Sequence, residues 1–185
     1  MINKLELFKE KDMHQIILIL TLICLPTTDM AELPIGQPAP LVELSGELGG
    51  RLNGESWSST ELTGKVHVLF YTDPDEKDLN NEASEALKAE KFDREKYGSV
   101  GIGNMAATWM PNFAINIALK KKQEKYPDTV YVKDMDKTIV KKWNLADDNN
   151  DVVLFDVDGT VLFSVDGQLS SSQIEQLISL IRERM

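Results

Sequence analysis

Short runs of β-branched and aromatic residues alternate with helix-forming segments along residues 65–185, and this alternation restricts the fold more than any other feature. The runs that predict strands are residues 65–71, 100–105, 129–133, 151–156 and 160–165. Helical segments connect the first three strands, which are therefore expected to pair in parallel. Asp158-Gly159 joins the last two strands as a hairpin turn, which adds an antiparallel pair. The pattern predicts a mixed sheet between two layers of helices.

Four helical segments are expected between and after these strands. The first begins with Asp73 as its N-cap and Pro74 as its first residue, and it runs to about residue 92. The second begins at Met110-Pro111, and its expected buried residues are Phe113, Ala114, Ile117 and Ala118. A short helix follows at 136–143. The last is capped by Ser170, and its apolar stripe is Ile174, Leu177, Ile178 and Ile181.

Residues 32–64 differ from the rest because they are rich in Gly, Pro and Ser. They predict short strands and turns that precede the core of residues 65–185 and form a single domain with it. Ser58 and Glu61 have the spacing of a capping box, which indicates one helical turn at 59–62. The expected fold class is α/β: a thioredoxin-like three-layer α/β/α sandwich with a mixed central sheet, an N-terminal β extension and a C-terminal ββα unit.

The first 31 residues are interpreted as a cleaved signal peptide. Residues 16–25 form an apolar run that would be about 15 Å long as a helix, half of a bilayer core and typical of a signal-peptide h-region. Cleavage near Ala31 would export the protein and leave no stable membrane span. Asp29 fits a cleavage site poorly, and Met13 is an alternative start to Met1. The other interpretation is a retained N-terminal helix packed in the core.

Charge and cysteine content exclude several classes of function. The chain has 30 acidic and 20 basic side chains and a net charge of −10, which disfavours nucleic-acid binding because that affinity comes largely from neutralised phosphates. Cys24 is the only cysteine and lies in the apolar run. The processed protein would therefore contain no cysteine, and it could neither form a disulfide nor carry out thiol redox chemistry.

Two segments resemble exported relatives of thioredoxin and peroxiredoxin. GKVHVLFYTDPDEKD at 64–78 resembles their first core strand and active-site loop, and residues 126–167 resemble their second half. More narrowly, the chain resembles the YtfJ family, small exported proteins of Gram-negative bacteria with a thioredoxin-like fold, over almost all of residues 36–185. The resemblance implies that fold and export to the periplasm. It rests on no catalytic signature, and the family is sometimes labelled as transcriptional regulators.

The departures from the thiol enzymes decide the expected function. Those enzymes carry a low-pKa cysteine after the first core strand and a cis-proline before the late hairpin. Here the matching positions are Thr72, Asp73, Pro74, Asp75 and Glu76, and loop 147–151 contains no proline. We therefore expect no catalytic residue, no cofactor and no enzyme activity. The loop Thr72–Glu76 is instead expected to bind a protein or peptide partner, because its aspartates would repel an anion.

Two other functions remain as alternatives. LFDVDGTVL at 154–162 matches the first motif of haloacid-dehalogenase phosphatases, in which Asp156 would be the nucleophile and Asp158 the general acid beside magnesium. Only 25 residues follow Thr160, too few to supply the downstream ligands of that family. A hairpin turn accounts for the same residues. A DNA-binding regulator is the second alternative, although an acidic chain suits that role poorly.

A few further residues are of types that can bind ligands. Asp147, Asn149 and Asp151 stand at alternate positions, as in a calcium loop, and are weak metal candidates in a segment better explained as a solvated loop. His67 lies within a strand and is expected to be packed without a catalytic role. Core or rim packing is the expectation for the three tryptophans, Trp57, Trp109 and Trp143.

Overall fold

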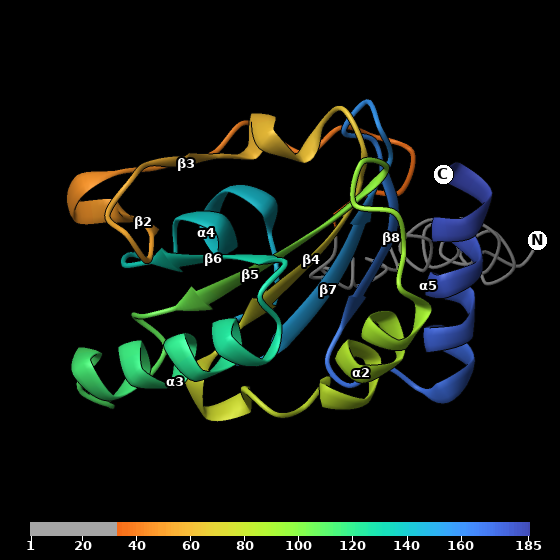
Figure 1. Ribbon diagram of the computed structural model, residues 1–185. Coiled ribbons are helices and arrows are strands. Elements are labelled where there is room, and N and C mark those ends of the chain that lie inside the picture. Colours follow the sequence, from red (N-terminus) through yellow and green to blue (C-terminus); the bar gives the residue numbers. More distant parts are fainter. Residues whose placement is uncertain (1–32) are drawn as a thin grey trace, which may run out of the picture. The chain divides into compact units, whose positions relative to one another are not determined.

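Six strands form one mixed sheet in the order β2-β6-β5-β4-β7-β8 in the computed structural model, which describes residues 33–185 (Figure 1). In chain order they are β2 (Gly49–Arg51), β4 (Val66–Thr72), β5 (Tyr97–Asn104), β6 (Thr129–Asp134), β7 (Asn150–Phe155) and β8 (Val161–Asp166). β4 pairs in parallel with β5, and β5 with β6, whereas the other pairings are antiparallel. The predicted parallel strands and the late hairpin are confirmed. The predicted signal peptide and Cys24 lie outside the described residues.

Helices cover both faces of this sheet (Figure 1). The helices are α2 (Asn81–Glu90), α3 (Asn112–Lys125), α4 (Thr138–Trp143) and α5 (Ser171–Arg184). α2, α3 and α5 lie on one face, where Val68 of β4 packs in a cluster with Leu87 and Leu177. α4 lies on the other face, where Leu69 of β4 packs with Ile139 and Trp143. A central strand that is buried on both sides accounts for the predicted three-layer sandwich.

The N-terminal extension contributes to the core, which corrects the expectation that it only precedes the core. β2 is an edge strand of the main sheet, paired with β6, and β1 (Glu43–Leu44) pairs with β3 (Trp57–Ser58) over the α4 face. Leu44 and Trp57 are both almost fully buried. Gly49 has φ +125°, and a Cβ there would lie 1.9 Å from the carbonyl oxygen of Lys133, so this edge pairing requires glycine.

Two short 3₁₀ helices in the extension complete this layer, η1 (Gly46–Leu48) and η2 (Ser59–Leu62). η2 confirms the predicted capping box, because the Ser58 side chain accepts from the first turn and the Glu61 side chain accepts from the Ser58 N–H. Leu62 of η2 is buried in the core. The cap therefore fixes a turn that supplies a core side chain.

The predicted helix at 74–92 is wrong in its first part. Pro74–Glu76 forms a single 3₁₀ turn, η3, and the α-helix begins only at Asn81. Asp73 precedes η3 but its side chain caps nothing. The chain turns between the two pieces because the buried Asn80 side chain donates to the Gly167 carbonyl and accepts from the Leu169 N–H, both at 2.9 Å. These contacts hold the helix start against the β8–α5 connection.

The predicted buried stripe of α3 is wrong for Phe113 and Ile117, two of its four residues. Ile115 is the one residue of α3 that is fully buried, while Phe113 is 69% exposed and Ile117 is 52% exposed. The helix is rotated so that Ala114, Ile115 and Ala118 face the sheet. The same spacing of apolar residues therefore leaves two large side chains in solvent.

Within residues 33–185, none of the helices combines the length and the apolar character needed to cross a membrane.

Candidate functional site

Polar side chains gather where the parallel strands end, the edge at which open α/β sheets commonly bind ligands. Asp73 directly follows β4, Asn104 ends β5 and Asp134 ends β6. The loop between α4 and β7 lies alongside, because the Asp73 N–H donates to the Asn149 carbonyl oxygen at 2.9 Å. This edge corresponds to the position after the first core strand where the sequence places Thr72–Glu76.

Asp73 is buried without a hydrogen-bond partner for either carboxylate oxygen. Its exposed fraction is 3%, and both oxygens lack contacts of ordinary hydrogen-bond geometry. Burial raises the pKa of Asp73 to about 6, and the nearby Asn104 side chain opposes part of this rise. Asn104 is itself fully buried, and neither atom of its amide has a partner of ordinary geometry. Buried polar groups without partners are rare and require an explanation.

Asp134 is the opposite case at the end of the neighbouring strand. It is fully buried, and its carboxylate accepts from the Tyr71 hydroxyl at 3.1 Å and from the backbone N–H groups of Asp136, Thr138 and Ile139 at 2.8–3.2 Å. The two last donors belong to the first turn of α4, so Asp134 anchors that helix to β6. Burial and the Asp134 carboxylate raise the pKa of Tyr71 well above its usual range. Asp134 is a structural residue.

Asp147 and Asp148 extend from the α4–β7 loop toward Asp73. One carboxylate oxygen from each of the three residues lies within 4.8 Å of the others, and we call this group the strand-end carboxylates. Asp147 and Asp148 are exposed, whereas Asp73 is buried. Lys137 donates to Asp147 at 2.7 Å, and this contact raises the pKa of Lys137. One ammonium group, which contacts Asp147, therefore lies near three carboxylates.

The residues that the alternate spacing singled out, Asp147, Asn149 and Asp151, have different surroundings. Asn149 accepts from the Asn150 N–H with its side chain. Asp151 is 1% exposed, and one of its oxygens accepts from the Ala146 N–H at 3.3 Å while the other has no partner. Burial raises the pKa of Asp151 to about 8, so this side chain is mostly neutral at pH 7. Asp147 alone of the three belongs to the strand-end carboxylates.

The loop Thr72–Glu76 presents only part of itself to solvent. Asp73 and Pro74 are buried, Thr72 and Glu76 are half-buried, and Asp75 is exposed. Direct contact with a partner is therefore open to Thr72, Asp75 and Glu76, and not to Asp73.

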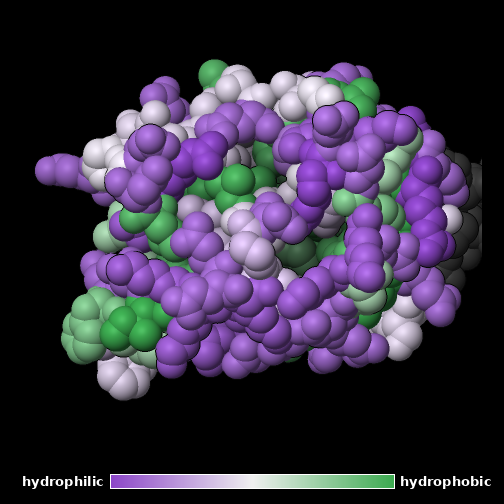
Figure 2. Space-filling model, in the orientation of Figure 1, coloured by the Kyte–Doolittle hydropathy of each residue, from purple (hydrophilic) through white to green (hydrophobic). Residues whose placement is uncertain are grey.

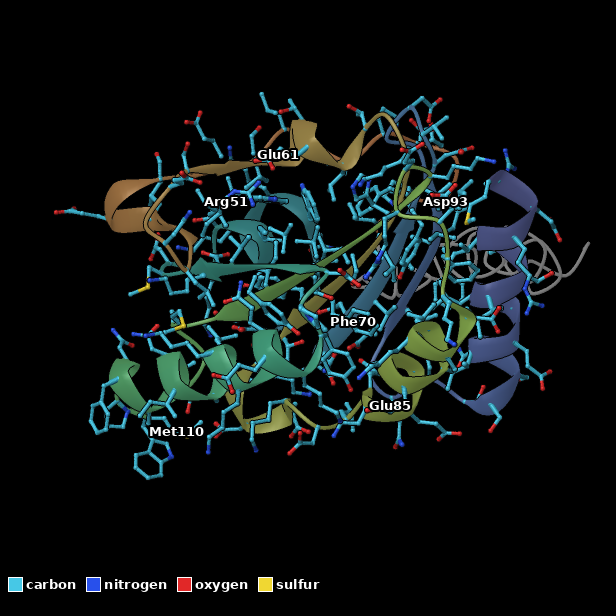
Figure 3. All side chains as sticks on the ribbon, viewed as in Figure 1. Arg51, Glu61, Phe70, Glu85, Asp93 and Met110 are labelled. Carbon is cyan, nitrogen blue, oxygen red and sulfur yellow. The ribbon has the colours of Figure 1, made fainter. Side chains whose placement is uncertain are left out.

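An apolar surface lies beyond the end of β5. The sequence analysis did not predict this surface. Trp109 is 89% exposed, so it does not pack as predicted, and Phe113 and Ile117 follow it at intervals of four residues. Figure 2 shows apolar side chains gathered at the lower left, at the start of α3, where Figure 3 labels Met110. We call Trp109, Phe113 and Ile117 the apolar surface of α3. Contiguous exposed apolar side chains on a soluble domain indicate an interaction site.

A cavity of about 820 Å³ lies between α2, α3 and the sheet. Phe70 points from the sheet into the space between the two helices (Figure 3), and the glycines of β5 at 101 and 103 leave room beneath α3. Lys122 bridges the helices at the rim by donating to the Lys77 carbonyl and the Asn81 side chain. Seven basic and two acidic residues line the cavity in a protein whose net charge is −10.

The remaining sequence candidates have structural partners. Asp156 pairs with Arg184 at 2.9 Å, and Asp158 accepts from the Thr160 N–H at 2.9 Å within the hairpin turn. Among residues 33–185, neither belongs to a group of three acidic or metal-binding side chains. His67 is buried, as predicted, and its ring contacts the Lys65 carbonyl, while burial lowers its pKa.

A model of the bacterial family described as "Bacterial protein of unknown function (YtfJ_HI0045)" matches residues 37–184 of this chain. The chain belongs to the YtfJ family. The uncharacterized protein YtfJ of Escherichia coli (strain K12) is 27% identical over 90% of this chain and 96% of its own length. An uncharacterized protein of Haemophilus influenzae is 33% identical over 88% of this chain and 95% of its own length.

Solved structures show the fold of this YtfJ family member. A putative protein disulfide isomerase from Bacteroides thetaiotaomicron has a TM-score of 0.59 at 18% identity, covering 81% of this chain and 91% of its own. A putative thioredoxin from Neisseria meningitidis has a TM-score of 0.57 at 16% identity, covering 80% and 91%. The thioredoxin-like fold is therefore confirmed. Unlike a dithiol enzyme, this chain has one cysteine in its whole sequence and no pair that could form a disulfide within it.

Proposed function

We propose that this YtfJ family member is a redox-inactive thioredoxin-like protein of the periplasm that acts by binding a protein or peptide partner. A cleaved signal peptide over residues 1–31 would export it and remove Cys24. The observation that carries the proposal is the apolar surface of α3, on which Trp109, Phe113 and Ile117 are exposed. No cysteine occurs in residues 33–185, which supports binding over thiol exchange.

Charge favours one kind of partner. Asp75 and Glu76 follow Asp73, one of the strand-end carboxylates, in the chain, and the whole chain has a net charge of −10. The complementary partner is a basic segment that inserts an apolar side chain against Trp109 and Phe113. The aromatic anchors would supply most of the affinity, and the acidic loop would mainly increase the association rate.

Photo-crosslinking in cells tests this proposal. A photoreactive phenylalanine analogue replaces Phe113 in one variant and Ile35, also exposed, in the control. We expect a discrete adduct from position 113 and none from position 35. The partner identified in the adduct is then purified, and Trp109→Ala with Phe113→Ala should weaken its binding by at least about 30-fold. Equal adducts at both positions, or an affinity that the double variant leaves unchanged, would contradict the proposal.

The cavity supports a second candidate function, the binding of a small amphipathic anion. Its volume falls within the range of small-molecule sites, and its walls combine apolar groups such as Phe70 and Leu87 with a rim that includes Lys122 and Lys125. The excess of basic residues at this one place in an acidic protein favours an apolar body with a carboxylate, phosphate or sulfonate head. Such a ligand would be retained in a native mass spectrum.

A further inference from the structure

Asp73 and Asp134 lie at corresponding ends of β4 and β6 but differ in the number of hydrogen bonds that their carboxylates accept. Asp134 accepts from four donors, so its burial is fully compensated. Asp73 is 3% exposed and accepts from none at ordinary geometry. A buried carboxylate without partners is strongly disfavoured unless a charged group compensates it. The Asn104 side chain lies beside Asp73 but makes no hydrogen bond of ordinary geometry with it, so a bound cation would compensate this carboxylate.

The surroundings of Asp73 are negative. Asp147 and Asp148 each bring a carboxylate oxygen to within 4.8 Å of an oxygen of Asp73, and the nearby cation, Lys137, contacts Asp147 at 2.7 Å. Like charges at this separation repel one another, so the three groups would spread apart without a further positive charge. The Asp73 N–H to Asn149 carbonyl bond nevertheless holds the loop in place.

The donor atoms at this point are all oxygens. The carboxylates of the three aspartates converge, and the Asn104 side chain, fully buried and without a partner for its amide oxygen, lies beside Asp73. No histidine or cysteine belongs to this group. A set of carboxylate and amide oxygens selects hard divalent cations over zinc or copper.

We propose that Asp73, Asp147 and Asp148, together with the amide oxygen of Asn104, bind a hard divalent cation, with Ca²⁺ as the expected ion. Two ligands come from adjacent residues of an irregular loop, which suits the flexible coordination of Ca²⁺ better than the strict octahedron of Mg²⁺. The bound ion would join the α4–β7 loop to the ends of β4 and β5. This site goes beyond the proposed partner binding, and its ligands differ from the alternate-position set of Asp147, Asn149 and Asp151.

Calorimetric titration of the purified full protein tests this site. The protein is first treated with EDTA and desalted, and it is then titrated separately with CaCl₂, MgCl₂ and MnCl₂. We expect one Ca²⁺ per chain with a dissociation constant of roughly 10–1,000 µM and weaker Mg²⁺ binding. Asp148→Asn should weaken Ca²⁺ binding at least tenfold, and Asp73→Asn should abolish the heat. Asp75→Asn, an exposed carboxylate in the neighbouring loop, is the matched control and should bind like the wild type.

Several results would overturn the proposal. One is that none of the three cations, up to about 10 mM, gives binding heat or raises the melting temperature. Another is that Asp148→Asn and Asp73→Asn leave the affinity for Ca²⁺ unchanged. Tighter binding of Mg²⁺ than of Ca²⁺ would overturn the choice of ion. Asp148 is exposed, so its variant folds and keeps the test decisive even if Asp73→Asn proves unstable.

Discussion

Replacing Asp134 by alanine is expected to lower the free energy of unfolding by about 3–5 kcal/mol. The substitution leaves the Tyr71 hydroxyl and the N–H groups of Thr138 and Ile139 without an acceptor in a buried place. It also removes the anchor of α4, whose Ile139 and Trp143 fill the core on that face of the sheet. Urea unfolding of the two proteins measures the difference directly.

The matched control is Asp136→Ala, two residues further along the same connection. The Asp136 side chain is 64% exposed and pairs with Lys141 on the surface, so its removal should change the free energy of unfolding by less than about 0.5 kcal/mol. Asp134→Asn should fall between the two, because an amide keeps one acceptor oxygen. A loss below about 1 kcal/mol for Asp134→Ala would contradict the structural role given to this residue.

Asp151→Asn is expected to make the protein more stable at pH 8 and to leave its stability at pH 4 nearly unchanged. Burial raises the pKa of folded Asp151 to about 8, above its ordinary value of 3.8, so the folded state keeps a proton that the unfolded state loses. The contribution of Asp151 to the free energy of unfolding is fully present below pH 3.8 and is lost as the pH rises toward 8. A rise in pKa from 3.8 to about 8 corresponds to a loss of at most about 6 kcal/mol across this range. The asparagine variant has no titrating group here and keeps its stability.

The measurement is the free energy of unfolding of both proteins between pH 4 and 9 in the presence of EDTA. Other groups titrate in the same range, such as His67, whose lowered pKa makes stability rise with pH. Their effects cancel in the difference between the two proteins. That difference should grow from near zero at pH 4 to its full value above pH 8. A constant difference would show that Asp151 is ionised in the folded protein and that its burial is compensated.

Local patterns in the sequence were enough to predict the sheet and its helical layers. β-Branched runs such as residues 65–71 are recognisable wherever they occur, and the Asp158-Gly159 turn and the Ser58 capping box specify their own geometry. The joining of β2 to β6 could not be predicted, because it depends on Gly49 approaching a backbone carbonyl of a strand 80 residues away. Likewise, the break at Asn80 depends on contacts with Gly167 and Leu169.

The candidate sites were harder to predict for the same reason. Phe113 and Ile117 have the spacing of a buried stripe, and only the rotation of α3 over a glycine-bearing strand places them in solvent. The strand-end carboxylates combine Asp73 with residues more than 70 positions later, so no spacing rule connects them. One signal was available in retrospect: acidic or amide residues stand at the ends of β4, β5 and β6, and parallel strands end at one edge.

We propose that this thioredoxin-like protein is exported, carries out no thiol chemistry and works by binding a partner. Native mass spectrometry of the protein released from the periplasm by osmotic shock tests this claim most directly. We predict a chain shortened by about 26–31 residues, without Cys24, which can then carry out no thiol exchange. A full-length chain recovered only from the cytoplasm, with Cys24 retained, would contradict the account.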